Sequence, residues 1–99
     1  MVVTIFRNRL KPDNVAEYYE WAARISELAK TMPGYVSHKG FTAEDGERVT
    51  IVEFADEASQ RNWSTEMRHV EAKKKGRAEF YTEYKLQVCS VQRESNFTA

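Results

Sequence analysis

The chain has 99 residues, of which 41% are hydrophobic, and its 15 basic and 15 acidic side chains cancel. This length suits one domain with a core, and the balanced charge argues against nucleic acid or an anionic membrane as the main partner. No apolar run approaches the roughly 20 residues of a membrane span, and the N-terminal residues lack a signal-peptide pattern. With Cys89 as its single cysteine, the chain has no internal disulfide, and we expect a cytoplasmic protein.

The first third of the chain reads as a strand followed by a helix. β-branched residues predict a strand from Val2 to Leu10. Asn14 is expected to cap the helix, with Glu17 completing a capping box. Pro33-Gly34 ends the helix. Apolar spacings of three and four predict its buried face, which Trp21 and Leu28 widen: Val15, Tyr18, Ala22, Ile25, Ala29 and Met32.

The remainder reads as a hairpin, a helix and a last strand. Strands are predicted from Tyr35 to Phe41 and from Arg48 to Phe54, joined by a polar turn that contains Asp-Gly. Asp56 is expected to cap the second helix, which is interrupted near Ser64-Thr65 and stops at Gly76. Tyr81 to Val91 then forms a strand, and residues 92–99 form a polar tail after a domain of residues 1–91.

The resulting order, β-α-β-β-α-β, is the ferredoxin-like pattern of the α+β class. It predicts an antiparallel four-stranded sheet with two helices on one face. The other face must also leave water, and a homodimer that packs sheet against sheet is the simplest solution. Clefts between sheet and helices are then the candidate ligand sites.

Several familiar catalytic patterns are missing. The sequence has no Gly-rich phosphate loop, no HExxH, no paired cysteines and no recognisable serine elbow. Only His38 and His69 supply imidazole, so we expect no multi-histidine metal site within one chain.

Asn8 is an amide among apolar neighbours. Alternation places it on the same side of the first strand as Phe6 and Leu10. A buried amide without partners costs roughly 1–3 kcal/mol. Two interpretations stay open: the amide meets solvent or a loop carbonyl at the strand end, or it points into a pocket towards a ligand.

Trp63 and His69 are the other candidates. Trp63 is either core or the flat wall of a pocket. His69 follows six positions later, about 120° away on an unbroken helix, so the two share a pocket only if the helix kinks. His69 is either a structural or surface residue, or a group that takes a proton near neutral pH.

The remaining polar and aromatic residues have mainly structural interpretations. The run from Lys73 to Arg77 is typical of a solvated helix end. Tyr81 and Tyr84 are expected on the sheet face, where a hydroxyl could line the cleft. Tyr18 is expected to pack, or to form the other wall of the pocket.

From Val2 to Val91 the chain resembles the antibiotic-biosynthesis-monooxygenase domain family, whose members are small dimeric α/β barrels. The resemblance is clearest in Asn8-Arg9-Leu10, Pro33-Gly34-Tyr35, Val52-Glu53-Phe54, Trp63, His69 and the run from Gly76 to Tyr84. It implies the ferredoxin-like fold and a homodimer.

The resemblance also implies an activity. Cofactor-independent members oxidise a polyphenolic substrate with O2, without metal or flavin. On this basis Asn8 and Trp63 hold substrate and oxygen, and His69 is the candidate base. The residues expected to bind the substrate are Asn62, Tyr18, Phe6 and Tyr84.

Two alternatives remain. Haem-degrading members use Asn, Trp and an iron-ligating His, and Asn8 and Trp63 match the first two. The position of that His holds Lys73 here, a protonated and poor iron ligand, and His69 lies one turn earlier. Haem as substrate therefore ranks second. The third hypothesis is a non-catalytic dimeric module that binds a small ligand.

Overall fold

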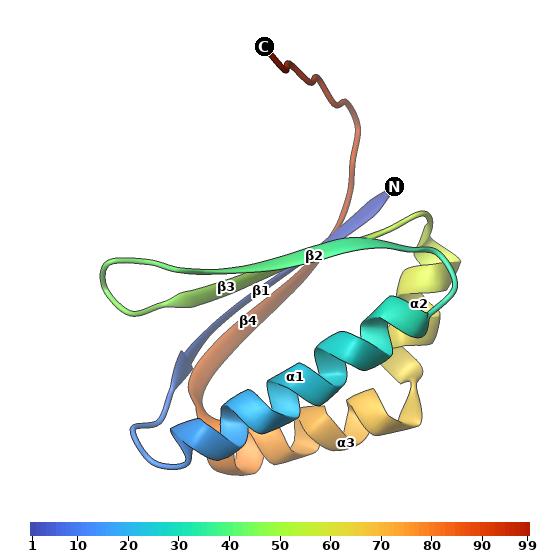
Figure 1. Cartoon of the computed structure of the whole chain (residues 1–99). Helices are drawn as coiled ribbons and strands as arrows, with labels where there is room; N and C mark the ends of the chain where they lie inside the picture. The colour runs from blue at the N-terminus through green and yellow to red at the C-terminus, as the bar shows by residue number, and fades with distance from the viewer.

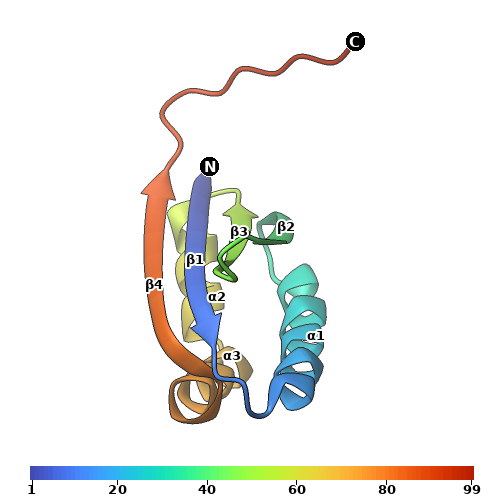
Figure 2. The same cartoon turned by 90° about the vertical axis from the view of Figure 1, so that its left-hand side faces the viewer.

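The computed structural model describes residues 1–99 as one four-stranded sheet with helices packed on one face (Figures 1 and 2). The ferredoxin-like α+β architecture and all four predicted strands are confirmed. No helix is both long and apolar enough to cross a membrane. The elements in chain order are β1 (Val2–Leu10), α1 (Val15–Thr31), β2 (Tyr35–Thr42), β3 (Arg48–Phe54), α2 (Glu57–Thr65), α3 (Met67–Lys75), the π-helical turn η1 (Gly76–Phe80) and β4 (Tyr81–Ser90).

The strand order is β2-β3-β1-β4, and each neighbouring pair is antiparallel. Side chains of directly paired residues lie on the same face of a sheet. Phe6, which pairs with Thr50 and Leu86, faces the helices together with these partners. The register places Asn8 between Arg48 and Tyr84 on that same face.

Helix α1 begins differently from the prediction. Asn14 has φ 63° and ψ 21°, in the left-handed region, and its side chain makes no capping hydrogen bond. A side-chain cap requires an extended backbone at that position, so the predicted capping box is wrong. Asn tolerates the left-handed conformation better than most residues, which explains its presence at this turn. The helix starts with the Tyr18 N–H donating to the Asn14 carbonyl, at 2.9 Å.

The second predicted helix is two helices. Asp56 caps α2 as predicted, its Oδ1 accepting from the Ser59 N–H at 2.8 Å. The predicted interruption is confirmed, and the extended residue is Glu66, with φ −60° and ψ 132°. The Glu66 carboxylate accepts from the His69 N–H at 3.1 Å and so starts α3. The chain changes direction between the two helices (Figure 1).

Helix α3 ends at Lys75 with Gly76 as its C-cap, as predicted, but Gly76 does not turn the chain out of helical conformation. Gly76 has helical φ and ψ of −58° and −48°, and the chain continues through the π-helical turn η1 to Phe80. The reason for glycine here is space, because a Cβ would lie 2.5 Å from Cε2 of Tyr81. The close approach fixes where β4 begins relative to the helix.

The compact core lies where α1 and α2 meet β3. Phe54 is completely buried and packs with Leu28, Ala29 and Trp63. One side of Trp63 thus packs in the core. Further along the sheet the helices stand away from the strands, and the intervening space is not filled.

Candidate functional site

A cavity of about 350 Å³ lies between the sheet and the helices. Its size is at the lower end of the range for small-molecule sites, and most of its lining residues are hydrophobic. Every element that packs across it contributes: Thr4 and Phe6 from β1, Trp21 and Ile25 from α1, and Val52 from β3. The predicted apolar face of α1 therefore forms both core and cavity wall.

Trp63 and His69 form one wall of this cavity. Their rings are stacked, with centroids 3.9 Å apart and an interplanar angle of 14°. On an unbroken helix these residues would point in different directions, and the break at Glu66 brings them together. The structure thus places both residues in the same site.

His69 is held as a neutral imidazole. Its Nδ1 lies 2.9 Å from the Trp63 carbonyl oxygen, which can only accept, so Nδ1 carries the proton. Burial lowers the pKa of His69 to about 4, and the Lys73 charge adds to this, while the Trp63 carbonyl and Glu66 oppose it. At neutral pH the imidazole therefore has an unprotonated Nε2, which accepts a hydrogen bond but holds a proton weakly.

Asn8 is 2% exposed, and neither atom of its amide has a hydrogen-bond partner. No protein group, a loop carbonyl included, satisfies it. Asn8 does not line the main cavity. Asn8 and its neighbour Tyr84 border a separate hollow of about 210 Å³, whose other lining residues include the ion pair of Arg7 and Glu47 on the opposite face of the sheet. The buried Nε of its other neighbour, Arg48, is also unpartnered.

Aromatic side chains form the end of the cavity nearest Asn8. The Phe6 ring contacts those of Tyr81 and Tyr84, with centroids 5.5 and 5.7 Å away, and Tyr18 contacts Tyr81 at 5.9 Å. Burial, with smaller contributions from Tyr18, raises the pKa of Tyr81 well above its usual value. Three predicted binding residues, Phe6, Tyr18 and Tyr84, thus line the cavity.

Asn62 does not belong to this group. It lies on the exposed side of α2 and is not among the residues that line the cavity. It precedes Trp63 by one residue, which on a helix is a rotation of about 100° away from the Trp63 direction. Asn62 is therefore not part of the candidate site.

Lys73 and Arg77 line the cavity, although the sequence predicts a solvated helix end there. The Lys73 ammonium donates to the carbonyl and hydroxyl oxygens of Ser64, at 2.7 and 3.0 Å. Arg77 Nη1 lies 3.4 Å from the Tyr84 hydroxyl. Their spacing in the sequence could have predicted this position. His69, Lys73 and Arg77 follow one another at intervals of four residues, which places them on the same side of a helical segment.

His38 is a third lining residue that the sequence analysis missed. Its Nδ1 lies 2.7 Å from the Tyr35 hydroxyl and its Nε2 3.1 Å from Ser26 Oγ. These contacts join β2 to α1 across the cavity. No group of three or more His, Cys, Asp or Glu side chains is arranged to hold a metal ion.

An antiparallel sheet with helices on one face and an apolar, aromatic cavity between them defines a ferredoxin-like domain with a candidate small-molecule site. Comparison with known proteins specifies the family. Residues 1–85 match the model of the antibiotic biosynthesis monooxygenase family, to which this chain belongs. The chain is also 30% identical over 88 residues to the uncharacterized protein YqjZ of Bacillus subtilis (strain 168), covering 89% of this chain and 77% of that protein.

Solved structures with low sequence identity have the same fold. SnoaB, a cofactor-independent oxygenase from Streptomyces nogalater, superposes with a TM-score of 0.79 at 19% identity, over 94% of each chain. Rv0793 from Mycobacterium tuberculosis gives a TM-score of 0.84 at 14% identity, over 96% of this chain and 98% of that one.

Proposed function

We propose that this protein is a monooxygenase that oxidises a small aromatic or polycyclic compound with O2 and needs no cofactor. The observation that carries the proposal is the stacked Trp63–His69 pair on the wall of an apolar cavity. The pair offers a flat surface for an aromatic ring next to a neutral imidazole with a free Nε2. Similarity to SnoaB supports the same class of reaction.

The proposed chemistry starts with the substrate itself. A phenolic substrate donates a hydrogen bond, and then a proton, to Nε2 of His69. The resulting electron-rich anion reduces O2; one oxygen atom enters the product and the other leaves as water. The cavity contributes by excluding water and by holding the ring against Trp63, so that substrate and oxygen meet in a fixed orientation.

Asn8 is proposed to bind oxygen or the developing anion. Its amide is already free of other partners, so it can donate to a ligand without breaking a bond. Tyr84, the strand neighbour of Asn8, lines the main cavity and is 44% exposed. Movement of the Tyr84 ring would connect Asn8 to the substrate.

Oxygen uptake tests this function. The purified protein is given 1,8-dihydroxyanthrone, a three-ring phenol, and uptake is recorded against a protein-free control, with the quinone product followed by absorbance. His69→Phe keeps a flat ring against Trp63 but removes both nitrogens, and we expect uptake to fall at least tenfold. Lys74→Met, an exposed position outside the cavity, is the matched control and should retain activity.

The outcome also decides between catalysis and simple binding. If no phenolic substrate gives protein-dependent uptake although the aromatic compound binds, the protein is a non-catalytic binding module. If His69→Phe is as active as the parent protein, His69 is not the base. Circular dichroism of each variant confirms that the fold is retained.

No observation favours haem degradation. Lys73, at the position where haem-degrading members have the ligating His, is hydrogen-bonded to Ser64 inside the cavity. Titration with haem tests this alternative, and a saturable Soret shift followed by its loss on adding ascorbate in air would replace the present proposal with haem degradation.

We also propose that the protein is a homodimer. All helices lie on one face of the sheet (Figure 2), so the other face is uncovered in a single chain. That face carries apolar side chains, including Ile5 and its partner Ile51, and Phe41 with its partner Val49. Light scattering should give twice the chain mass of 11.5 kDa, and Ile51→Asp should give the monomer. A monomeric parent protein would refute the proposal.

A further inference from the structure

The cavity is lined by positive and neutral groups only. The chain has 15 acidic residues, yet none of the side chains that line the cavity is Asp or Glu. Two lining residues carry a positive charge, Lys73 and Arg77. Burial holds the third titratable candidate on this wall, His69, in its neutral form at pH 7. The cavity of a protein with zero net charge is therefore electropositive at one end.

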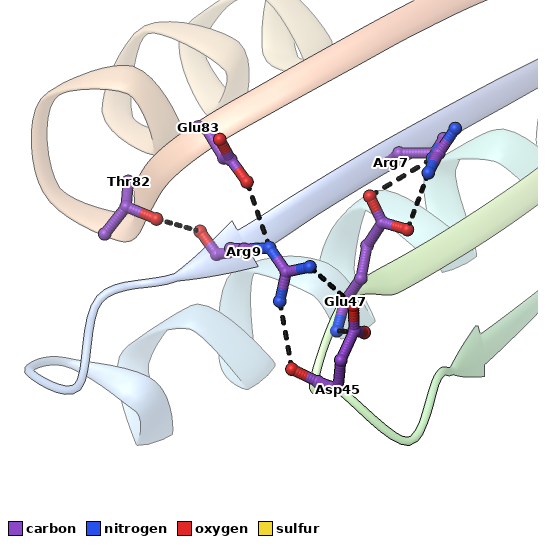
Figure 3. A network of polar contacts seen from close by, with 6 residues as sticks. All are labelled: Arg7, Arg9, Asp45, Glu47, Thr82 and Glu83. Atoms are coloured by element: carbon purple, nitrogen blue, oxygen red, sulfur yellow. Dashed lines mark hydrogen bonds and ion pairs between the residues drawn. The ribbon is translucent and has the colours of Figure 1, made fainter.

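No carboxylate pairs with either cation, whereas six of the other thirteen basic residues form ion pairs. On the opposite face of the sheet, Arg7 pairs with Glu47 at 2.9 Å, and Arg9 pairs with Asp45 at 2.8 Å and Glu83 at 3.0 Å (Figure 3). No carboxylate of the chain therefore neutralises the charge of Lys73 or Arg77.

Lys73 and Arg77 retain unused hydrogen-bonding capacity. The Lys73 ammonium has three donors, and Ser64 accepts two of them. Arg77 makes one long contact, 3.4 Å to the Tyr84 hydroxyl, out of five guanidinium donors. Ser64 holds the ammonium in place without neutralising it. The remaining donors are free for a ligand.

The two charges also destabilise one another. Residues four apart on a helix are neighbours, and like charges there repel. Burial lowers the pKa of Lys73, and the nearby Arg77 charge lowers it further. An anion bound between Lys73 and Arg77 would offset both the repulsion between the two charges and the burial of the Lys73 ammonium, because it supplies the missing opposite charge.

We propose that the natural ligand of this cavity is an aromatic anion, whose ring lies against Trp63 and His69 and whose carboxylate or phenolate group is bound by Lys73 and Arg77. This inference depends on the proposed function only in taking the cavity as the substrate site. For a phenolic substrate it adds a role in the chemistry, because two cations stabilise the phenolate that a weak base such as His69 must form.

A matched pair of fluorescent probes tests the charge preference. 8-Anilinonaphthalene-1-sulfonate and N-phenyl-1-naphthylamine have the same aromatic rings, and only the first carries an anionic group. Both brighten in apolar surroundings, so dissociation constants follow from titration. We expect the anionic probe to bind the parent protein more tightly. Lys73→Met or Arg77→Met should weaken its binding roughly tenfold and change binding of the neutral probe less than twofold.

Two control variants locate the effect. Lys74→Met removes a neighbouring exposed charge of the same helix and should leave both dissociation constants unchanged. Ala72→Leu adds volume to a side chain that lines the cavity and should weaken both probes. Equal binding of the two probes, unchanged anion binding in both Met variants, or an anion affinity that Ala72→Leu leaves intact would each overturn the proposal.

A third probe separates the two kinds of anionic group. 2-Naphthol has an ionisable hydroxyl, and its absorbance reports its protonation state when bound. If the head group is a phenolate, the parent protein should lower the pKa of bound naphthol and Lys73→Met should restore it. If the cavity takes only carboxylates, this pKa stays unchanged while the sulfonate preference remains. None of these readouts requires turnover, so an inactive protein that prefers anions would refute the oxygenase proposal alone.

Discussion

The imidazole of His69 lies flat on the indole of Trp63, with ring centroids 3.9 Å apart. Glu66 makes this contact possible by ending α2 with its backbone and starting α3 with its side chain. The same residue therefore sets both the direction of α3 and the composition of the cavity wall. The break between two helices is part of the candidate site.

Removing the Glu66 carboxylate should weaken the stack. In Glu66→Ala, the His69 N–H loses its acceptor, and we expect the free energy of unfolding to fall by about 1 kcal/mol. The near-UV circular dichroism of Trp63 should also decrease, since its ring is less fixed. Glu71→Ala, at an exposed position within α3, is the control. An unchanged near-UV spectrum in Glu66→Ala would show that packing alone holds the stack.

Stability should depend on pH through His69. Its pKa is about 4 in the fold and near the ordinary value of 6.5 in the unfolded chain, so between these values the unfolded state binds more protons. The contribution of His69 to the free energy of unfolding is fully present above pH 6.5 and is lost progressively as the pH falls to 4. A shift of this size corresponds to roughly 3 kcal/mol.

Urea unfolding of the parent protein and His69→Phe at intervals from pH 7 to pH 4 measures this effect. Carboxylates also titrate at the acidic end, so the informative quantity is the difference between the two proteins. We expect the difference in the free energy of unfolding between the two proteins to change by most of the roughly 3 kcal/mol between pH 7 and pH 4. Parallel stability curves would contradict the low pKa of His69.

Gly76→Ala should be destabilising for steric reasons. The new methyl group would lie 2.5 Å from Cε2 of Tyr81, so the ring or the π-helical turn must move. We expect a loss of about 1–3 kcal/mol, measured by urea unfolding. Gly40→Ala is the matched control, because a Cβ there meets its nearest atom at 3.9 Å. Equal stability of the two variants would show that Tyr81 is free to move away.

Asn8→Leu separates function from stability. The substitution keeps the approximate volume and removes two buried amide atoms that have no partner, so the variant should be as stable as the parent protein or about 1 kcal/mol more stable. Oxygen uptake should nevertheless be lost if Asn8 binds oxygen or the anion. A variant that is destabilised by several kcal/mol would show that the amide has partners in solution, such as buried water.

Residue patterns within single elements were reliable guides. β-branched residues predicted the first strand, and period-two alternation correctly placed Phe6 and Asn8 on its helix-facing side. Apolar spacing predicted the buried face of α1. The sequence did not predict the left-handed conformation of Asn14 or the π-helical turn that follows Lys75, because φ and a close contact with another element decide the conformation there.

The sequence by itself determined the order of strands and helices, and with it the ferredoxin-like fold, because hydrophobic periodicity specifies which face of each element is buried. The tertiary structure decided which polar groups reach the cavity. It placed Lys73 and Arg77 at the cavity, kept Asn62 outside it, and buried Asn8 beside Tyr84. The rotation of α3 relative to α2 depends on packing across the Glu66 break, and periodicity within one element carries no information about the angle between two.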